Sequence, residues 1–106
     1  GAKQYARLKP LLDEVIVSGS RDDAARAQTM RGDIEAAQGN MELAVLDYLR
    51  TVVLFKNQKD AQPEALFKAA EALDKLRDGR AKQLYAQLAT DYPSSPYAAQ
   101  AKAKAQ

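Results

Sequence analysis

Residues of the same size and chemistry recur 37 positions apart along this 106-residue chain. A fixed period of this length indicates a repeat architecture, in which each unit packs mainly against its neighbours. We therefore expect a stack of similar units. The matched pairs are Ala44 and Ala81, Tyr48 and Tyr85, Phe55 and Tyr92, Ala61 and Ala98, Ala24 and Ala61, Leu12 and Leu49, Val15 and Val52, and Ile16 and Val53.

Local propensity indicates that each unit is helical. Ala occupies 21 of the 106 positions, β-branched residues are few, and no segment shows the alternation of apolar and polar residues typical of a strand. Helix caps and breakers divide the chain into six antiparallel helices of an all-α fold. The first expected helix is Lys3–Val17, with Pro10 as a kink or start, and the second runs from Ser20 and Asp23 to about Gln38. The third covers about Met41–Lys56 and is capped by Asn40, and the fourth covers about Ala61–Arg77 with Pro63 in its first turn. The fifth runs from Asp78-Gly79 to about Tyr92, and Ser95 and Pro96 begin a short sixth.

The stretch MRGDIEAAQGNMELAVLDYLRTVV places Gly32, Gly39, Ala44 and Tyr48 at positions typical of the tetratricopeptide repeat, which this chain resembles. A second copy has Ala70 where the first has Gly32, and it places Ala81, Tyr85 and the closing Pro93 where the family pattern expects them. The sequence departs from the family pattern at Gln28, Arg31 and Lys56, and its period exceeds the usual ~34 residues. The resemblance implies helical hairpins stacked as a right-handed superhelix over residues 1–106.

The phrase LYAQLATDYPSSPYAAQA is similar to long-repeat tetratricopeptide proteins of the bacterial envelope, so the resemblance implies a bacterial protein of the periplasm or cell envelope. In this register the chain starts and ends halfway through a repeat, and we expect it to be a fragment of a longer array. The apolar stripe of the first helix, Leu8, Leu12 and Val15, should then be partly uncovered, which predicts self-association through the repeat ends.

Composition argues against an enzyme. The chain has no His and no Cys, so it offers no imidazole base, no thiolate and no His or Cys metal site. Its carboxylates are adjacent in sequence or lie among lysines on one helix face, where they indicate solvated charge. We expect no catalysis and no cofactor. The net charge of +2 without an Arg cluster argues against nucleic-acid binding, and no apolar run is long enough to span a membrane.

The third helix is apolar on nearly every side, from Met41 to Phe55. All-round hydrophobicity usually means burial, so we expect this helix to form the core between its neighbours. The alternative is an apolar surface that binds a partner.

The family resemblance assigns a concave groove to the first helix of each hairpin, which grips a peptide or a helix. We accordingly predict a non-enzymatic scaffold that binds a protein segment through this groove, with Phe67 as an apolar anchor unless it packs in the core. The alternative function is a structural spacer in a larger solenoid. The predicted groove residues are Arg26, Thr29, Asp33, Ala37, Glu64, Phe67, Glu71 and Lys75.

Overall fold

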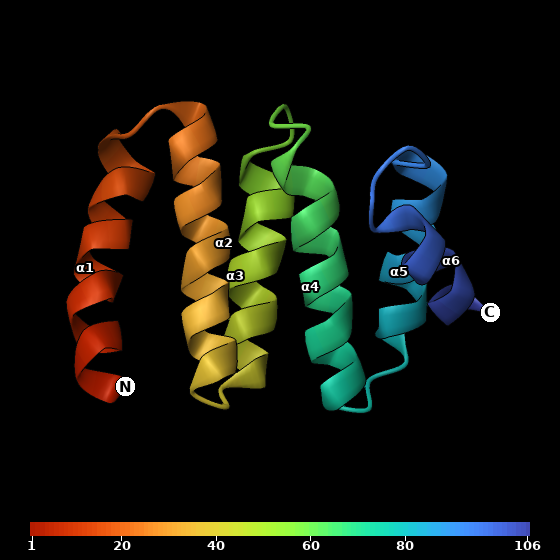
Figure 1. Ribbon diagram of the computed structural model, residues 1–106, viewed down its shortest axis with the longest axis horizontal. Coiled ribbons are helices and arrows are strands. Elements are labelled where there is room, and N and C mark those ends of the chain that lie inside the picture. The colour runs from red at the N-terminus through yellow and green to blue at the C-terminus, as the bar shows by residue number, and fades with distance from the viewer.

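The computed structural model describes residues 1–106 and contains six α-helices and no strand, which confirms the all-α prediction. Figure 1 shows the helices running alternately up and down, with α3 behind α2 and α4. Each helix packs against the next, and α2 also contacts α4, so the fold is a stack of helical hairpins. The helices are α1 (Ala2–Ser18), α2 (Arg21–Ala37), α3 (Met41–Leu54), α4 (Ala61–Lys75), α5 (Arg80–Asp91) and α6 (Ala98–Ala105).

Several helix ends form as the sequence predicts. The Ser20 hydroxyl accepts a hydrogen bond from the backbone N–H of Asp23 at 3.2 Å and caps α2. Gly39, just after α2, has a φ of +82 and ends this helix. The left-handed backbone conformation that ends a helix costs glycine little, because glycine has no Cβ. The Asp78 carboxylate accepts from the Arg80 backbone N–H at 2.9 Å before α5, and the Arg80 guanidinium lowers the pKa of Asp78 to about 2.

Five other predicted features differ from the structure. Asn40 precedes α3, but its side-chain amide donates to Glu35 at 3.1 Å and makes no capping bond. Helix α3 ends at Leu54 and α4 at Lys75, each a little before the approximate end that the sequence predicts. Arg77, with φ +56, turns the chain after α4. The sixth helix begins at Ala98, since Ser95 accepts from Tyr97 and holds Pro96 in the preceding turn. Pro10 lies inside α1 and so does not mark its start, which is one of the two predicted alternatives.

The repeated alanine and tyrosine pairs occupy equivalent positions in the two complete hairpins. Ala44, Ala81, Tyr48 and Tyr85 are all buried. Tyr48 donates to Asp33 on α2 at 2.7 Å, and Tyr85 donates to Asp74 on α4 at 3.0 Å. Burial and the neighbouring carboxylate raise the pKa of each phenol well above its ordinary value, so both stay protonated as donors. The 37-residue period therefore marks the contact between the helices of each hairpin.

The contact between α2 and α3 is unusually polar. Gln28 donates through Nε2 to the backbone oxygen of Asp47 at 3.2 Å and to its carboxylate at 3.1 Å. Deeper in the same contact, the hydroxyls of Thr29 and Thr51 lie 3.0 Å apart and share a hydrogen bond. All four side chains are buried. This hairpin therefore depends on satisfied polar pairs.

The prediction that α3 is wholly core is wrong for one side of the helix. Tyr48 and Thr51 are buried toward α2, but Leu43 and Leu46 are each 50% exposed, and Val53 and Leu54 are exposed to a similar extent. The first two of these side chains lie one helical turn apart, so α3 presents an apolar outer face to solvent.

Helix α1 shows the partial exposure that the sequence predicts. Leu12 is buried with Ala27 and Ile34 of α2, whereas Leu8 and Val15 remain exposed.

Candidate functional site

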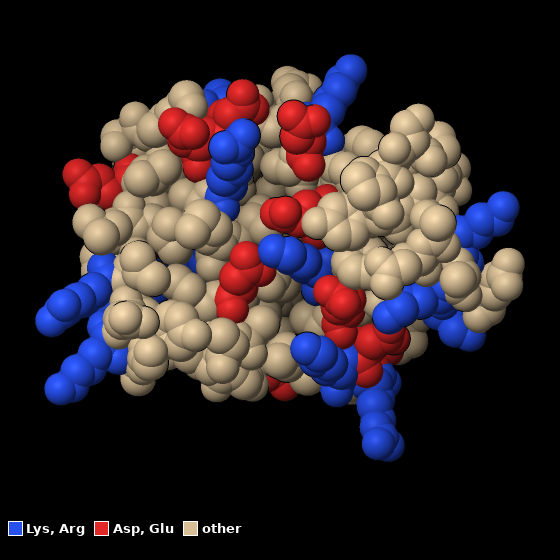
Figure 2. Space-filling view, in the orientation of Figure 1, with Lys and Arg blue, Asp and Glu red and all other residues tan.

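A groove runs between α2 and α4 on the side of the molecule that faces the viewer in Figure 2, where acidic and basic side chains gather. It consists of two hollows of about 430 and 170 Å³. Asp33 and Lys68 line both hollows, so the two are parts of one groove. This groove has the place that the sequence predicts for a binding surface on the first helices of the hairpins.

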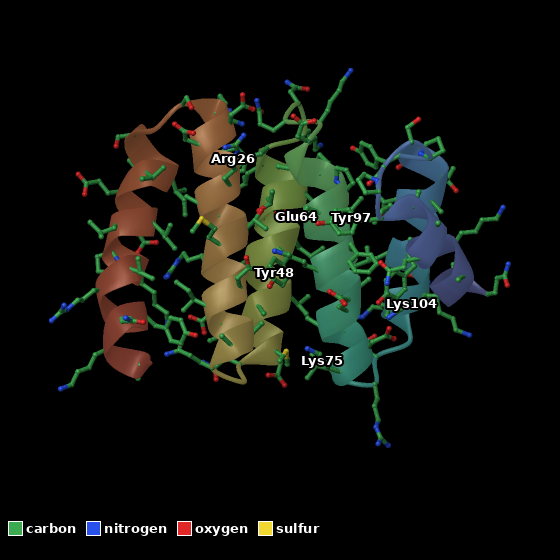
Figure 3. All side chains as sticks on the ribbon, viewed as in Figure 1. Arg26, Tyr48, Glu64, Lys75, Tyr97 and Lys104 are labelled. Atoms are coloured by element: carbon green, nitrogen blue, oxygen red, sulfur yellow. The ribbon has the colours of Figure 1, made fainter.

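The structure brings six of the eight predicted residues together in this groove. The larger hollow is lined by Arg26, Thr29, Asp33 and Glu64. The smaller one is lined by Asp33, Glu71 and Lys75. Figure 3 shows Arg26 and Glu64 toward one end of α2 and α4 and Lys75 toward the other. Mixed charge therefore extends along most of the length of both helices.

Two predicted residues lie outside the groove, and a third is buried in its wall. Phe67 is only 6% exposed, and its ring packs against Tyr85 and Tyr97 with centroid separations of 5.7 and 5.0 Å. It is a core residue, as the alternative interpretation held. Thr29 reaches the groove wall but is buried, and its hydroxyl donates to the Ala25 carbonyl at 3.0 Å. Ala37 is exposed at the end of α2 and lines neither hollow.

Asp33 ties three helices together. Its two carboxylate oxygens each accept from the Lys68 ammonium on α4 at 3.0 Å, and one of them also accepts from the Tyr48 hydroxyl on α3. Lys68 is additionally 3.9 Å from Glu64. Asp33 therefore holds the groove together, while Glu71 has no ion-pair partner within 4.0 Å and remains available to a ligand.

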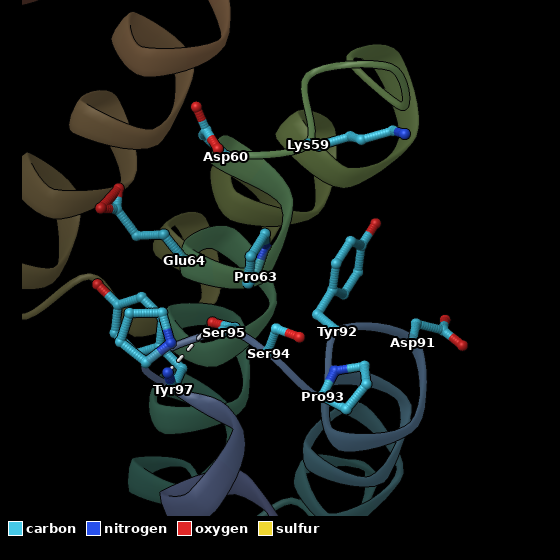
Figure 4. Close-up of a pocket in the computed structure, with 11 residues that line it drawn as sticks. Lys59, Asp60, Pro63, Glu64, Asp91, Tyr92, Pro93, Ser94, Ser95 and Tyr97 are labelled. Atoms are coloured by element: carbon cyan, nitrogen blue, oxygen red, sulfur yellow. Dashed lines mark hydrogen bonds between the residues drawn. The ribbon is translucent and has the colours of Figure 1, made fainter.

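A third hollow of about 560 Å³ adjoins the groove where the turn between α5 and α6 approaches the start of α4. Figure 4 shows the rings of Tyr92 and Tyr97 around this hollow, with Pro63 and Pro93 nearby. Asp60 and Glu64 line both this hollow and the groove, so the surface is continuous. We call the three hollows together the charged track.

Sequence reasoning missed Lys68, Tyr92 and Tyr97 in this track. The repeat pattern matches Tyr92 only with Phe55, and Tyr97 follows Pro96, which predicts the start of a helix and no binding site. A pair of tyrosines flanking Pro93 and Pro96 was the available signal, because such a turn holds aromatic rings at the surface.

The charged track is acidic although the whole chain carries +2. Its lining contains six carboxylates and four cationic side chains. The carboxylates are Asp22, Asp33, Asp60, Glu64, Glu71 and Asp91, and the cations are Arg26, Lys59, Lys68 and Lys75. This surface favours a ligand with a net positive charge.

Comparison of the chain with family models, with curated proteins and with solved structures gives no match. None of the six helices combines the length and the apolar character that crossing a bilayer requires.

Proposed function

We propose that the chain is a protein-interaction scaffold that binds a basic peptide or helical segment of another protein along the charged track. The observation that carries this proposal is the continuity of the track, in which three hollows share Asp60 and Glu64 at one junction and Asp33 and Lys68 at the other. A continuous groove suits a chain segment better than a compact ligand, which needs an enclosed and mostly apolar pocket.

The aromatic and the acidic side chains of the charged track would make different contacts with the bound segment. Tyr92 and Tyr97 are half-buried aromatic groups at one end, suited to packing against an apolar side chain of the segment. Glu64 and Glu71 lie further along α4 and would pair with Lys or Arg side chains, which sets the register and raises the rate of encounter. The resemblance to tetratricopeptide repeats supports the same face as the binding surface.

A random 12-residue peptide library displayed on phage, selected on the immobilised chain, tests this proposal. The selected peptides should carry a net positive charge. Their binding should weaken about tenfold in Glu64→Lys and in Glu71→Lys, because each change removes an attraction and adds a repulsion.

Glu14→Lys provides the matched control, since it makes the same change of charge on an exposed face of α1 away from the track. The selected peptides should bind this variant like the original chain. Peptides without a positive bias, equal binding to all three variants, or no selected peptide at all would each overturn the proposal. The last of these results would favour the structural spacer.

A further inference from the structure

The outer face of α3 is an apolar surface that the charged track does not use. Leu43 and Leu46 are each 50% exposed, and Val53 reaches 58%. None of the three lines the charged track. Figure 1 shows α3 on the far side of α2 and α4 from the viewer, away from the groove between them. The molecule therefore has two different surfaces on opposite sides of the stack.

The repeat architecture does not require apolar residues on this face. Helix α5 is the counterpart of α3 in the next hairpin, and the 37-residue step matches Leu43 with Arg80, Leu46 with Gln83 and Val53 with Thr90. A hairpin of the same kind thus forms with polar side chains at these positions. Contact between the two helices of a hairpin therefore does not account for the exposed leucines of α3.

The exposed face continues into a hollow of about 600 Å³ between α3 and α5. Exposed apolar surface of this kind, rimmed by polar residues, marks interaction sites. The rim carries Glu42, Asp78, Arg80 and Gln83. Six apolar residues line the hollow, namely Val45, Leu46, Leu49, Leu73, Leu76 and Leu84.

The charges on α3 indicate what covers this face. Glu42 and Arg50 lie four residues to either side of Leu46, so the three side chains share one face of the helix. A second α3 laid antiparallel across the first, with Leu46 at the two-fold axis, brings Glu42 of each copy opposite Arg50 of the other. Leu43 then faces Leu49 of the partner copy. The face is therefore complementary to itself in both charge and hydrophobicity, as an isologous interface requires.

Arg50 can take part in such a contact. Its guanidinium lies 3.2 Å from the Asp47 carboxylate within the chain, but the Arg50 side chain remains 57% exposed. Glu42 forms no ion pair within the chain at all. The two charges that the antiparallel arrangement would pair are thus at the surface.

We propose that two copies of this chain associate through the outer faces of their α3 helices, antiparallel, with the two Leu46 side chains at the two-fold axis. The interface is modest, since stable dimers bury about 800 Å² per partner and the exposed parts of a few leucines and a valine supply less. Coverage of the hollow between α3 and α5 must add to it. We expect a dimer with a dissociation constant on the order of 10–100 μM that leaves both charged tracks open.

Cross-linking provides a direct test, because the chain contains no cysteine and a single introduced thiol is unique. In Leu46→Cys the two thiols meet at the axis, so mild oxidation at 100 μM chain should give a disulfide-linked dimer at least about tenfold faster than in Val17→Cys. Val17 is 86% exposed on α1 and serves as the control for random collision. Equal rates in the two variants would overturn the proposal.

Sedimentation of the uncross-linked chain provides the second test. Leu46→Asp should make the chain monomeric at every concentration, whereas Leu11→Asp should leave dimerisation unchanged. Leu11 is a suitable control because it is 57% exposed on α1, at the end of the stack. A monomeric original chain at 500 μM, or a dimer that Leu11→Asp dissociates and Leu46→Asp does not, would contradict the α3 interface.

Charge exchange tests the antiparallel register. Glu42→Arg should weaken the dimer about tenfold, and adding Arg50→Glu to the same chain should restore it, since the double variant rebuilds both ion pairs with the signs exchanged. Thermal unfolding by circular dichroism would establish that the variants are folded. A folded double variant that dimerises no better than Glu42→Arg would refute the register with Leu46 at the axis.

Discussion

The hairpins α2–α3 and α4–α5 place different side chains at equivalent buried positions. Eight buried residues of α2 correspond to buried residues of α4 at an offset of 38, and α3 corresponds to α5 at an offset of 37. In the first hairpin Gln28 meets Asp47 and Thr29 meets Thr51. The matching residues of the second hairpin are Leu66 with Leu84 and Phe67 with Leu88. The same backbone arrangement therefore accepts either hydrogen-bonded or apolar contacts.

This difference determines how each hairpin responds to substitution. Apolar packing loses free energy in proportion to the volume removed, whereas a buried polar pair is sensitive to the loss of one partner and tolerant of the loss of both. The second hairpin also belongs to the main core, which includes side chains of α3, α4, α5 and α6. We expect the second hairpin to contribute more to global stability.

Leu66→Ala should give the largest effect. Leu66 is 1% exposed, and the cavity left by this truncation should lower the free energy of unfolding by about 2–5 kcal/mol. The equivalent change in the first hairpin, Gln28→Ala, should cost less, about 1–3 kcal/mol for the hydrogen bonds lost by Asp47. Urea unfolding measures both, and equal losses would remove the distinction between the hairpins.

Gly32→Ala should be next. A Cβ at Gly32 would lie 2.5 Å from the Tyr48 ring, which is buried and hydrogen-bonded to Asp33, so we expect a loss of about 1–3 kcal/mol from overpacking. Gly79→Ala is the control because its Cβ meets nothing within 4 Å and its φ of −61 suits alanine. That variant should be as stable as the original chain or more stable by about 0.5 kcal/mol. Thermal unfolding of the two glycine variants tests whether α2 approaches α3 as closely as this contact requires. Equal stability of Gly32→Ala and Gly79→Ala would contradict such a close approach.

The threonine pair tests the tolerance of the first hairpin. Thr29→Val alone should cost about 1–2 kcal/mol, because it leaves the buried Thr51 hydroxyl without its partner. Thr51→Val alone should cost less, because the Thr29 hydroxyl keeps its hydrogen bond to the Ala25 carbonyl. The double variant should cost less than the sum of the two, since it converts the contact to the apolar type of Phe67 and Leu88. A double-mutant cycle by chemical denaturation measures the coupling, and strictly additive losses would show that the shared hydrogen bond contributes nothing.

The smallest effects should appear in the pH dependence that two carboxylates of the first hairpin, Glu35 and Asp47, contribute. A hydrogen bond from the Lys9 ammonium lowers the pKa of Glu35, so its stabilisation is present above the unfolded pKa and is lost as pH falls through the folded pKa. Burial raises the pKa of Asp47, so protonation of that group favours the folded state as pH falls.

Glu35→Gln should therefore cost about 1 kcal/mol at pH 7, and the difference should shrink toward pH 3. Asp47→Asn should make the chain lose more stability between pH 7 and pH 4 than the original does. Melting curves recorded across this pH range measure how the stability of each variant changes with pH. The second hairpin has Leu73 and Leu84 at the positions that match Glu35 and Asp47, so it has no carboxylates there. If stability changed with pH in both variants as it does in the original chain, Glu35 and Asp47 would not be the source of the pH dependence.

The sequence predicted the six helices and the hairpin contact because repetition of Ala44 and Tyr48 at Ala81 and Tyr85 records a packing requirement directly. It could not decide between surface and core for Phe67, since the ring faces a turn whose shape depends on the Ser95 hydrogen bond to Tyr97. The exposure of α3 was missed for a related reason. Hydrophobicity reports the preference of a helix for burial, whereas the number of neighbouring helices decides how much of it is covered.

The charged residues of the groove were predictable by helical spacing, because positions four apart on α4 share a face. The roles of those residues were not. Asp33 has the same charge and similar surroundings in sequence as Glu71, yet only Asp33 meets both a tyrosine hydroxyl and a lysine from other helices. Such convergence depends on three helices at once and leaves no pattern along the chain.

The contact of Asp33 with Lys68 is the one ion pair that joins the hairpin α2–α3 to the hairpin α4–α5. Both side chains are partly open to solvent, so dissolved electrolyte weakens their attraction, while the buried tyrosine still holds Asp33 from behind. Concentrated salt should therefore weaken this one electrostatic link across the groove, while the apolar core that α3 shares with α4 and α5 keeps the two hairpins packed together.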